Sequence, residues 1–190
     1  MILQAALLRQ AQSQFSIHID FAVQAQILPS LKQLQLEHRF SKDLMIAVCK
    51  QSPIVQDGRE ILMGNALWLG FENEFGLAIH LLCPQVEHIV RSLLKQAGAI
   101  TTNLSIDGIE NENGLSTLME LPEAEQIFGK DLTFEIKSIF TEALGYNLRN
   151  NVAHGLLNDD ESTSIASIYA WWMILRLIIR SIVHGKIIKD

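Results

Sequence analysis

The sequence predicts a compact all-α fold, a helical bundle with a minor β-hairpin around residues 99-113. Three observations lead to this prediction. Apolar residues make up 48% of the 190 residues and recur mainly at helical spacing. The chain has only 11 glycines and 4 prolines, which together with its apolar content excludes disorder, collagen-like chains and turn-rich disulfide miniproteins. The segment that combines β-branched residues with turn formers is short, which limits the expected β-structure to one hairpin.

In the N-terminal region the sequence predicts two helices, over residues 1–14 and 20–38. Asp20 is a suitable N-cap for the second helix, because its carboxylate can accept hydrogen bonds from the first free N–H groups. Pro29 should kink or restart this helix, since proline has no amide proton and its ring collides with the preceding turn. The apolar residues of the second helix repeat at helical spacing and are Val23, Ile27, Leu31 and Leu34.

The clearest helix covers residues 72–97, whose apolar side chains form one continuous stripe. Gly98 is a natural stop after this helix, and Pro84 should bend it. Glu87 and Arg91 lie four residues apart, in the order that favours an ion pair on a helix surface.

A small hairpin is expected next, with its turn at Asp107-Gly108. Pro122 is typical of the first position of a helix, and Gly145 would end that helix. The apolar stripe of this predicted helix consists of Leu132, Ile136, Ile139, Phe140, Ala143 and Leu144.

The last predicted helix, residues 163–183, is apolar almost all round, which is typical of a helix buried in a core or an interface. Its uninterrupted apolar run, Ile165 to Leu175, is about half of the ~20 residues that a bilayer requires. Arg176 and Arg180 would be costly in lipid, so no membrane partner is expected; they are either solvated or line a binding surface. The aromatic residues of this helix, expected in the core, are Tyr169, Trp171 and Trp172.

We expect residues 51-190 to form the main helical domain. Residues 1-50 would supply N-terminal helices that pack onto it or remain from a longer chain.

The net charge of −6 disfavours broad coating of nucleic acid but leaves room for a local cationic pocket. Cys49 and Cys83 stand in apolar contexts, so we expect buried thiols in a reducing compartment. Because the N-terminus also lacks signal-peptide features, a cytoplasmic location is expected.

The segment most informative about function is YNLRNNVAHGLLNDD, residues 146–160. Asn147 as N-cap and Gly155 as stop predict a short helix from Leu148 to His154. Arg149 would then occupy the first turn of this helix.

This short helix carries residue types that suit a phosphate group. The N-terminus of a helix attracts anions, and the planar guanidinium of Arg149 matches phosphate oxygens. Asn150 and His154 would share one face, and an imidazole can exchange a proton near neutral pH. The spacing alone is a weak signal, since chance predicts about 0.7 matches in this chain. The same spacing also fits a purely structural interpretation, in which the asparagine caps the helix, the arginine lies on the surface and the histidine is structural.

Other polar residues are interpreted structurally. His80 lies in an apolar stripe and is expected to be a satisfied core or interface histidine. The run Asp159, Asp160 and Glu161 is interpreted as a solvated helix start. No clustered carboxylates stand at ligand spacing near the short helix, so neither a metal nor another cofactor is expected.

The string RNNVAHG, residues 149–155, resembles the RNxxxHG signature of a helical domain family in the HEPN (higher eukaryote and prokaryote nucleotide-binding) superfamily. HLLCPQVEHIVRSLLKQAG, residues 80–98, is similar to the family's long helix, and the Trp-rich last helix is similar too. The resemblance covers about residues 50 to 183. It implies a HEPN-type helical bundle.

The resemblance also implies a metal-independent endoribonuclease that acts on RNA as a homodimer, with a composite site at the interface. Arg149 and His154 would be catalytic, and Asn150 and Asn151 would bind the RNA phosphate or support the site. Glu87 and Arg91 would either form a plain surface pair or brace the short helix from behind. The products would be 2′,3′-cyclic phosphate and 5′-hydroxyl ends.

The setting implied by the resemblance is phage defence or a stress response, with an antitoxin or regulatory protein as a further partner. Leu156 stands where some HEPN toxins have a modified tyrosine, which puts that mode of control in doubt. The alternative is a non-catalytic HEPN dimer that binds a nucleotide or a protein partner.

Overall fold

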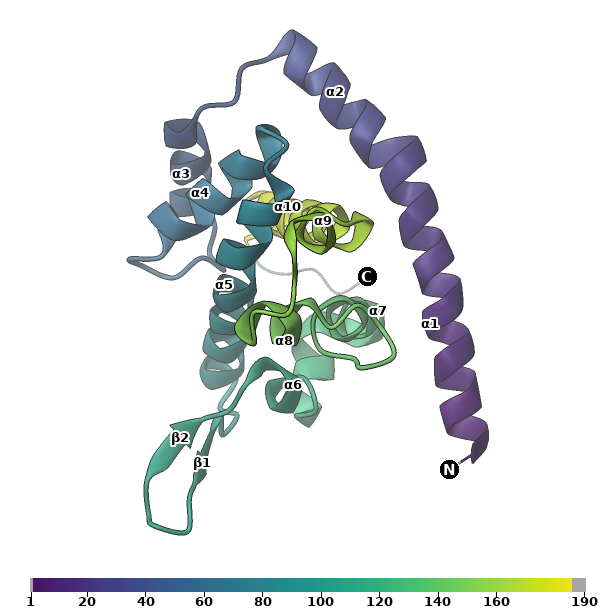
Figure 1. Ribbon diagram of the computed structural model, residues 1–190. Coiled ribbons are helices and arrows are strands. Elements are labelled where there is room, and N and C mark those ends of the chain that lie inside the picture. The colour runs from purple at the N-terminus through teal and green to yellow at the C-terminus, as the bar shows by residue number, and fades with distance from the viewer. Residues whose placement is uncertain (1, 186–190) are drawn as a thin grey trace.

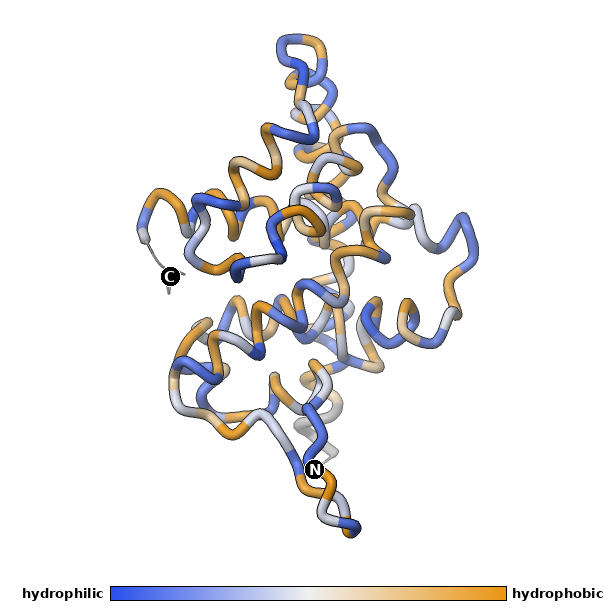
Figure 2. Tube along the Cα trace, turned by 90° about the vertical axis from the view of Figure 1, so that its left-hand side faces the viewer, coloured by the Kyte–Doolittle hydropathy of each residue, from blue (hydrophilic) through white to orange (hydrophobic). Residues whose placement is uncertain are grey.

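The computed structural model describes residues 2–185 and has the predicted all-α architecture with one two-stranded hairpin (Figure 1). The central helix is α5 (Phe75–Gln96), and α10 (Ile165–His184) packs against it. Along the helices, hydrophobic and hydrophilic stretches alternate, as expected where one face of each helix is buried (Figure 2). The other elements of the bundle are α3 (Lys42–Gln51), α4 (Glu60–Phe71), α6 (Leu115–Leu118), α7 (Pro122–Phe140), α8 (Leu148–Ala153) and α9 (Asp159–Ser162).

The N-terminal segment forms a long helical rod along one side of the bundle (Figure 1). It consists of α1 (Ile2–Ala22), the π-helical turn η1 (Val23–Ile27) and α2 (Leu28–Glu37). The predicted break between residues 14 and 20 is wrong, and Asp20 lies inside α1 rather than at an N-cap. At Pro29 the helix does not stop: the backbone stays right-handed helical through Ile27 and Leu28, and α2 begins with this proline in its first turn, directly after the wider π turn.

This rod packs onto the rest of the chain. Gln12 donates a buried hydrogen bond of 2.9 Å to Oγ of Ser138 in α7. Phe15 makes edge-to-face contacts with Phe134 and Tyr169, and Ile19 is completely buried. Residues of the first fifty therefore share one hydrophobic core with the main helical region.

Trp171 joins α10 to α4 at the centre of the core. Its indole N–H donates to the carbonyl of Leu67 at 3.0 Å, and the ring lies against the backbone of Gly70. A Cβ atom added at Gly70 would lie 2.1 Å from the indole nitrogen, so only glycine permits this approach. Trp171 and Tyr169 are core residues, as predicted, being 1% and 5% exposed.

The predicted hairpin is confirmed. Strands β1 (Thr102–Leu104) and β2 (Glu110–Glu112) pair antiparallel with Thr102 opposite Glu112. Gly108 takes a positive φ of 74° in the turn, a conformation that glycine adopts without strain. The hairpin projects from the end of α5 beyond the helical bundle (Figure 1).

Helix α7 departs from the prediction at its C-terminal end. It begins at Pro122, as expected, but ends at Phe140 instead of continuing to Gly145. Ala143 and Leu144 are exposed rather than part of the apolar stripe. Gly145 instead allows a tight reversal, since a Cβ there would lie 2.2 Å from the carbonyl oxygen of Ser138.

Helix α10 is mostly enclosed by the fold. The helical run Asp159–His184 is long and apolar enough to cross a membrane, but 61% of its most apolar window is buried inside the bundle. Arg176 is not simply solvated, because its Nη2 donates to both carboxylate oxygens of Glu135, at 2.8 and 2.9 Å. This burial is typical of a core helix.

Candidate functional site

Helix α8 carries the two residues of the predicted Arg–His motif. It spans Leu148–Ala153, one residue shorter than predicted, with His154 at its C-cap and Gly155 at a positive φ of 63°. Leu148 is 2% exposed and anchors the helix in the core. Asn147 precedes the helix as predicted, but it is left-handed (φ 51°) and its side chain caps no backbone N–H. Its Oδ1 instead accepts a hydrogen bond of 2.7 Å from the Asn150 side chain.

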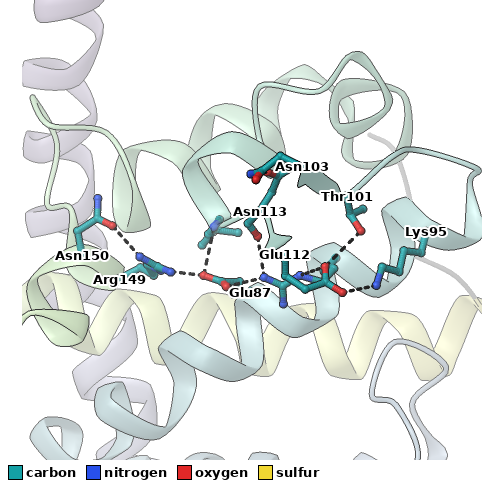
Figure 3. A network of polar contacts seen from close by, with 10 residues as sticks. Glu87, Lys95, Thr101, Asn103, Glu112, Asn113, Arg149 and Asn150 are labelled. Atoms are coloured by element: carbon teal, nitrogen blue, oxygen red, sulfur yellow. Dashed lines mark hydrogen bonds and ion pairs between the residues drawn. The ribbon is translucent and has the colours of Figure 1, made fainter. Parts of the chain in front are cut away.

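Arg149 is held in one orientation by two side chains. Its Nε donates to Oε2 of Glu87 at 2.7 Å, and its Nη1 donates to Oδ1 of Asn150 at 3.1 Å (Figure 3). Its Nη2 lies beside Gly114, where a Cβ atom would come within 3.3 Å of it. The guanidinium is thus fixed before any ligand binds, which reduces the entropy cost of binding an anion.

Glu87 is the centre of this polar network. Besides Arg149, its carboxylate accepts a 2.6 Å hydrogen bond from Arg91 and a 3.1 Å hydrogen bond from the backbone N–H of Leu115. Burial raises the pKa of Glu87, but these hydrogen bonds and the charge of Arg149 together outweigh burial and lower it. Glu87 is therefore a carboxylate at neutral pH, and it braces α8 from α5, one of the two roles considered above.

Arg91 extends the network toward the hairpin. It donates to the carbonyl of Asn113 at 2.7 Å, and its Nε lies 3.1 Å from a carboxylate oxygen of Glu112. Glu112 also pairs with Lys95 at 2.6 Å, so the network runs from α8 across α5 to β2 (Figure 3). Arg91 is 16% exposed and is held as firmly as Arg149.

A cavity of about 380 Å³ opens beside this network, between α5, α8 and the start of α4. Its walls carry three guanidinium groups and two imidazoles but only one carboxylate. In a chain with a net charge of −6, this is a local concentration of positive charge, as expected for an anion site. The lining residues are Arg59, His80, Cys83, Pro84, Glu87, His88, Arg91, Arg149, Val152 and Ala153.

His80 does not lie in the core, one of the two environments predicted for it; the other, an interface, stays a prediction. It is exposed and lines the cavity, with Nδ1 placed 2.8 Å from the carbonyl oxygen of Gly76. The apolar stripe of α5 runs beside His80 rather than through it, because neighbouring Ile79 takes the buried position.

His154 is exposed at the end of α8, and its imidazole makes no hydrogen bond or ion pair with residues 2–185. It follows Ala153, the last lining residue on α8, but does not itself line the cavity. Asn151 points elsewhere, since its side chain donates to the carbonyl of Tyr146 at 3.2 Å. The structure thus brings Arg149, Asn150, Glu87 and Arg91 into one network and leaves Asn151 in a supporting contact.

The cavity offers neither an activated thiol nor a cluster of metal ligands. Burial raises the pKa of Cys83 to about 12, so its thiol stays protonated at neutral pH. Within residues 2–185, no group of three or more His, Cys, Asp or Glu side chains could hold a metal ion.

Asp159 and Glu161 belong to a solvated helix start with a capping box at Asn158, as predicted. Both cysteines are buried free thiols, also as predicted.

Sequence reasoning missed two residues of the cavity, Arg59 and His88. Arg59 stands in the turn before α4 and reaches the cavity from a segment far from the motif. His88 follows Glu87 on α5, and no spacing rule links it to Arg59 or to Arg149. The only signal available was the position of His88 beside a predicted ion pair.

The chain matches no protein-family model, no curated protein and no solved structure. Its function is therefore proposed from its own residues and from the resemblance over about residues 50 to 183.

Proposed function

We propose that this protein is a metal-independent endoribonuclease that cleaves RNA to 2′,3′-cyclic phosphate and 5′-hydroxyl ends. In this proposal Arg149 and His154 act on the scissile phosphate, in a composite site formed by two copies of the chain. The resemblance to HEPN proteins adds a setting, phage defence or a stress response, in which an antitoxin or regulatory protein controls the enzyme.

The observation that carries the proposal is the state of Arg149. Its guanidinium is fixed by Glu87 and Asn150 at the edge of a cavity with surplus positive charge. His154 lies at the other end of the same short helix with its imidazole free to contact a ligand. A fixed cation beside an accessible proton-transfer group is what phosphodiester cleavage by the 2′-hydroxyl requires.

The reaction would use the substrate's own nucleophile. An imidazole removes the proton of the 2′-hydroxyl, whose oxygen attacks the phosphorus. The bond from phosphorus to the 5′-oxygen breaks, and a second imidazole gives that oxygen a proton. Arg149 stabilises the extra negative charge of the five-coordinate phosphorus. Asn150 keeps the guanidinium in place without adding charge.

Two proton-transfer groups are needed, and α8 supplies one histidine. A dimer that brings two copies of α8 together would supply His154 twice. Leu77 and Leu156 favour such an interface, being 59% and 65% exposed close to the site. Leu77 shares a face of α5 with His80 and Pro84, at helical spacing.

The test is cleavage of an RNA oligonucleotide in the presence of EDTA. The wild-type protein should release cyclic-phosphate ends, and His154→Ala should abolish their release. His38→Ala is the matched control, because His38 is an exposed histidine outside the cavity, and it should cleave normally. Intact RNA with the wild-type protein, or equal cleavage by His154→Ala, would refute the proposal.

One observation favours the alternative, a non-catalytic dimer that binds a nucleotide. His154 is not among the residues that line the cavity, whereas three arginines are. A protein of this kind would bind a nucleoside phosphate through Arg149 and leave RNA intact. Binding of a mononucleotide that is lost in Arg149→Gln, together with absent RNA cleavage, would support this alternative.

A further inference from the structure

The cavity is lined by another arginine, Arg59, that comes from a different element than Arg149. Arg59 reaches it from the turn before α4, while Arg149 reaches it from α8. Between them α5 contributes Glu87, His88 and Arg91. The two arginines therefore approach the same cavity from two separate elements that both pack on α5.

Arg59 differs from the other arginines of the cavity in its partners. Arg91 and Arg149 are both paired with Glu87, which neutralises part of their charge. Arg59 has only a long contact of 3.5 Å to the neutral side-chain oxygen of Gln85. Among residues 2–185 no carboxylate pairs with Arg59. Its positive charge is thus available to a ligand.

His88 supports the presence of a positive field in this region. Burial lowers its pKa, and the charges of Arg59, Arg91 and Lys95 lower it further, while Glu112 acts in the opposite direction. His88 is therefore a neutral imidazole near neutral pH, which can still donate one hydrogen bond to an anion. A half-buried neutral donor beside an unpaired guanidinium is suited to a phosphate.

We propose that Arg59 and His88 form a second phosphate subsite, which binds a phosphate of the RNA strand next to the one held by Arg149. This inference rests on the proposed function for its substrate and extends it. The substrate is then a strand with at least two phosphates, rather than a mononucleotide. Arg91 also lines the cavity, whereas its partner Glu112 does not, so the lining keeps a surplus of positive charge.

The first experiment measures binding without cleavage. A single-stranded 2′-O-methyl RNA cannot be cleaved, because it has no free 2′-hydroxyl. Its dissociation constant is measured by fluorescence anisotropy at several salt concentrations. Each phosphate contact on a single strand contributes about 0.7 to the slope of log K against log salt. Arg59→Gln should make the slope shallower by about 0.7, whereas Arg59→Lys should keep the wild-type slope.

The matched control is Arg39→Gln, an exposed arginine in the turn between α2 and α3 that does not line this cavity. It should keep the wild-type slope. Circular dichroism and the melting temperature of each variant show that the comparison concerns folded protein. An unchanged slope in Arg59→Gln, or an equal change in Arg39→Gln, overturns the subsite, as does a wild-type protein that does not bind the strand.

The second experiment counts phosphates. A dinucleoside monophosphate is compared with the same dinucleotide carrying one additional terminal phosphate, at either end. The additional phosphate should strengthen binding to the wild-type protein at least about tenfold, the amount expected for a charge-assisted contact. Arg59→Gln should show no such gain. A gain of the same size in Arg59→Gln, or no gain in the wild-type protein, overturns the inference.

These experiments separate the two proposals. If Arg59→Gln changes the salt slope but wild-type protein leaves ordinary RNA intact, the nuclease proposal fails and the phosphate subsite stands. If wild-type protein cleaves RNA and Arg59→Gln cleaves with an unchanged KM and an unchanged salt slope, the subsite fails and the nuclease proposal stands.

Discussion

At the residue scale, Glu87 supports three groups with one carboxylate: Arg91, Arg149 and the backbone N–H of Leu115. Its side chain is only 15% exposed, so these contacts replace most of its water. Removing its charge would leave two half-buried guanidinium groups without their main partner. Glu87 therefore contributes to the position of α8, together with Leu148, and to the orientation of Arg149, together with Asn150.

We expect Glu87→Gln to lower the free energy of unfolding by about 2–4 kcal/mol, the range for breaking a largely buried ion pair from one side. Urea denaturation followed by circular dichroism measures this change. Glu120→Gln is the control, since Glu120 is 69% exposed in its pair with Lys137 and should lose less than about 1 kcal/mol. Equal losses in the two variants would contradict the bracing role of Glu87.

The lowered pKa of Glu87 also predicts a pH dependence. Because the folded protein holds this pKa below its ordinary value of 4.5, the contribution to stability is complete above that value. It is lost as pH falls through the folded pKa, where Glu87 takes up a proton. The difference in unfolding free energy between wild type and Glu87→Gln should therefore shrink only in the range below about pH 4.5, as the pH falls toward the folded pKa. A difference that stays constant over this range would show that the carboxylate is not the source of the effect.

The residues of the site were predicted from sequence only where they lie on one short segment. Arg149, Asn150 and His154 lie within six positions, so helical spacing and the resemblance identify them together. The contact between Arg149 and Glu87 joins positions 62 residues apart, and spacing cannot supply it. The contribution of Arg59 likewise depends on how α4 packs on α5, which becomes visible only in the folded chain.

At the scale of elements, prediction succeeded where periodicity and end signals agreed. Helix α5 ends before Gly98 and α7 begins at Pro122, since these residues have strong local preferences. Prediction failed where packing overrides a local preference. Helix α1 continues through Phe15, which binds the core through Phe134 and Tyr169, although the local sequence indicated a break.

The contact between α4 and α10 gives a prediction at the scale of elements. Gly70→Ala should lower the unfolding free energy by about 2–3 kcal/mol and the melting temperature by about 5–10 °C, because its Cβ would collide with the rigid, fully buried indole of Trp171. Thermal denaturation is the measurement. Gly76→Ala, whose Cβ would lie 3.3 Å from the Thr163 methyl group and 3.4 Å from the Cβ of Ser162, should change stability by less than about 1 kcal/mol. A melting temperature of Gly70→Ala equal to that of the wild type would show that α4 and α10 can separate without cost.

At the scale of the whole molecule, the net charge of the chain and the charge of the candidate site have opposite signs. The chain as a whole is acidic, yet the cavity between α5, α8 and the start of α4 is cationic. In the proposed function, this cavity would attract a strand of RNA, although the acidic chain as a whole repels it. We therefore expect the proposed binding of RNA in the cavity to weaken strongly as the salt concentration rises.

The proposed composite site makes activity depend on dimerisation. Cleavage per chain should fall on dilution below the dimer dissociation constant, because a single copy of α8 supplies one of the two proton-transfer groups. Leu77→Glu should shift the protein toward the monomer and reduce cleavage in parallel, since it places a charge in an apolar interface. Leu36→Glu is the control, because Leu36 is 74% exposed on α2 and lies outside the cavity, and its oligomeric state should not change. Sedimentation velocity and the cleavage rate are measured at the same protein concentrations. A monomer with full cleavage activity would show that one chain contains the complete site. The second proton-transfer group would then be His80 or His88 of the same cavity, in place of His154 from a second copy of the chain.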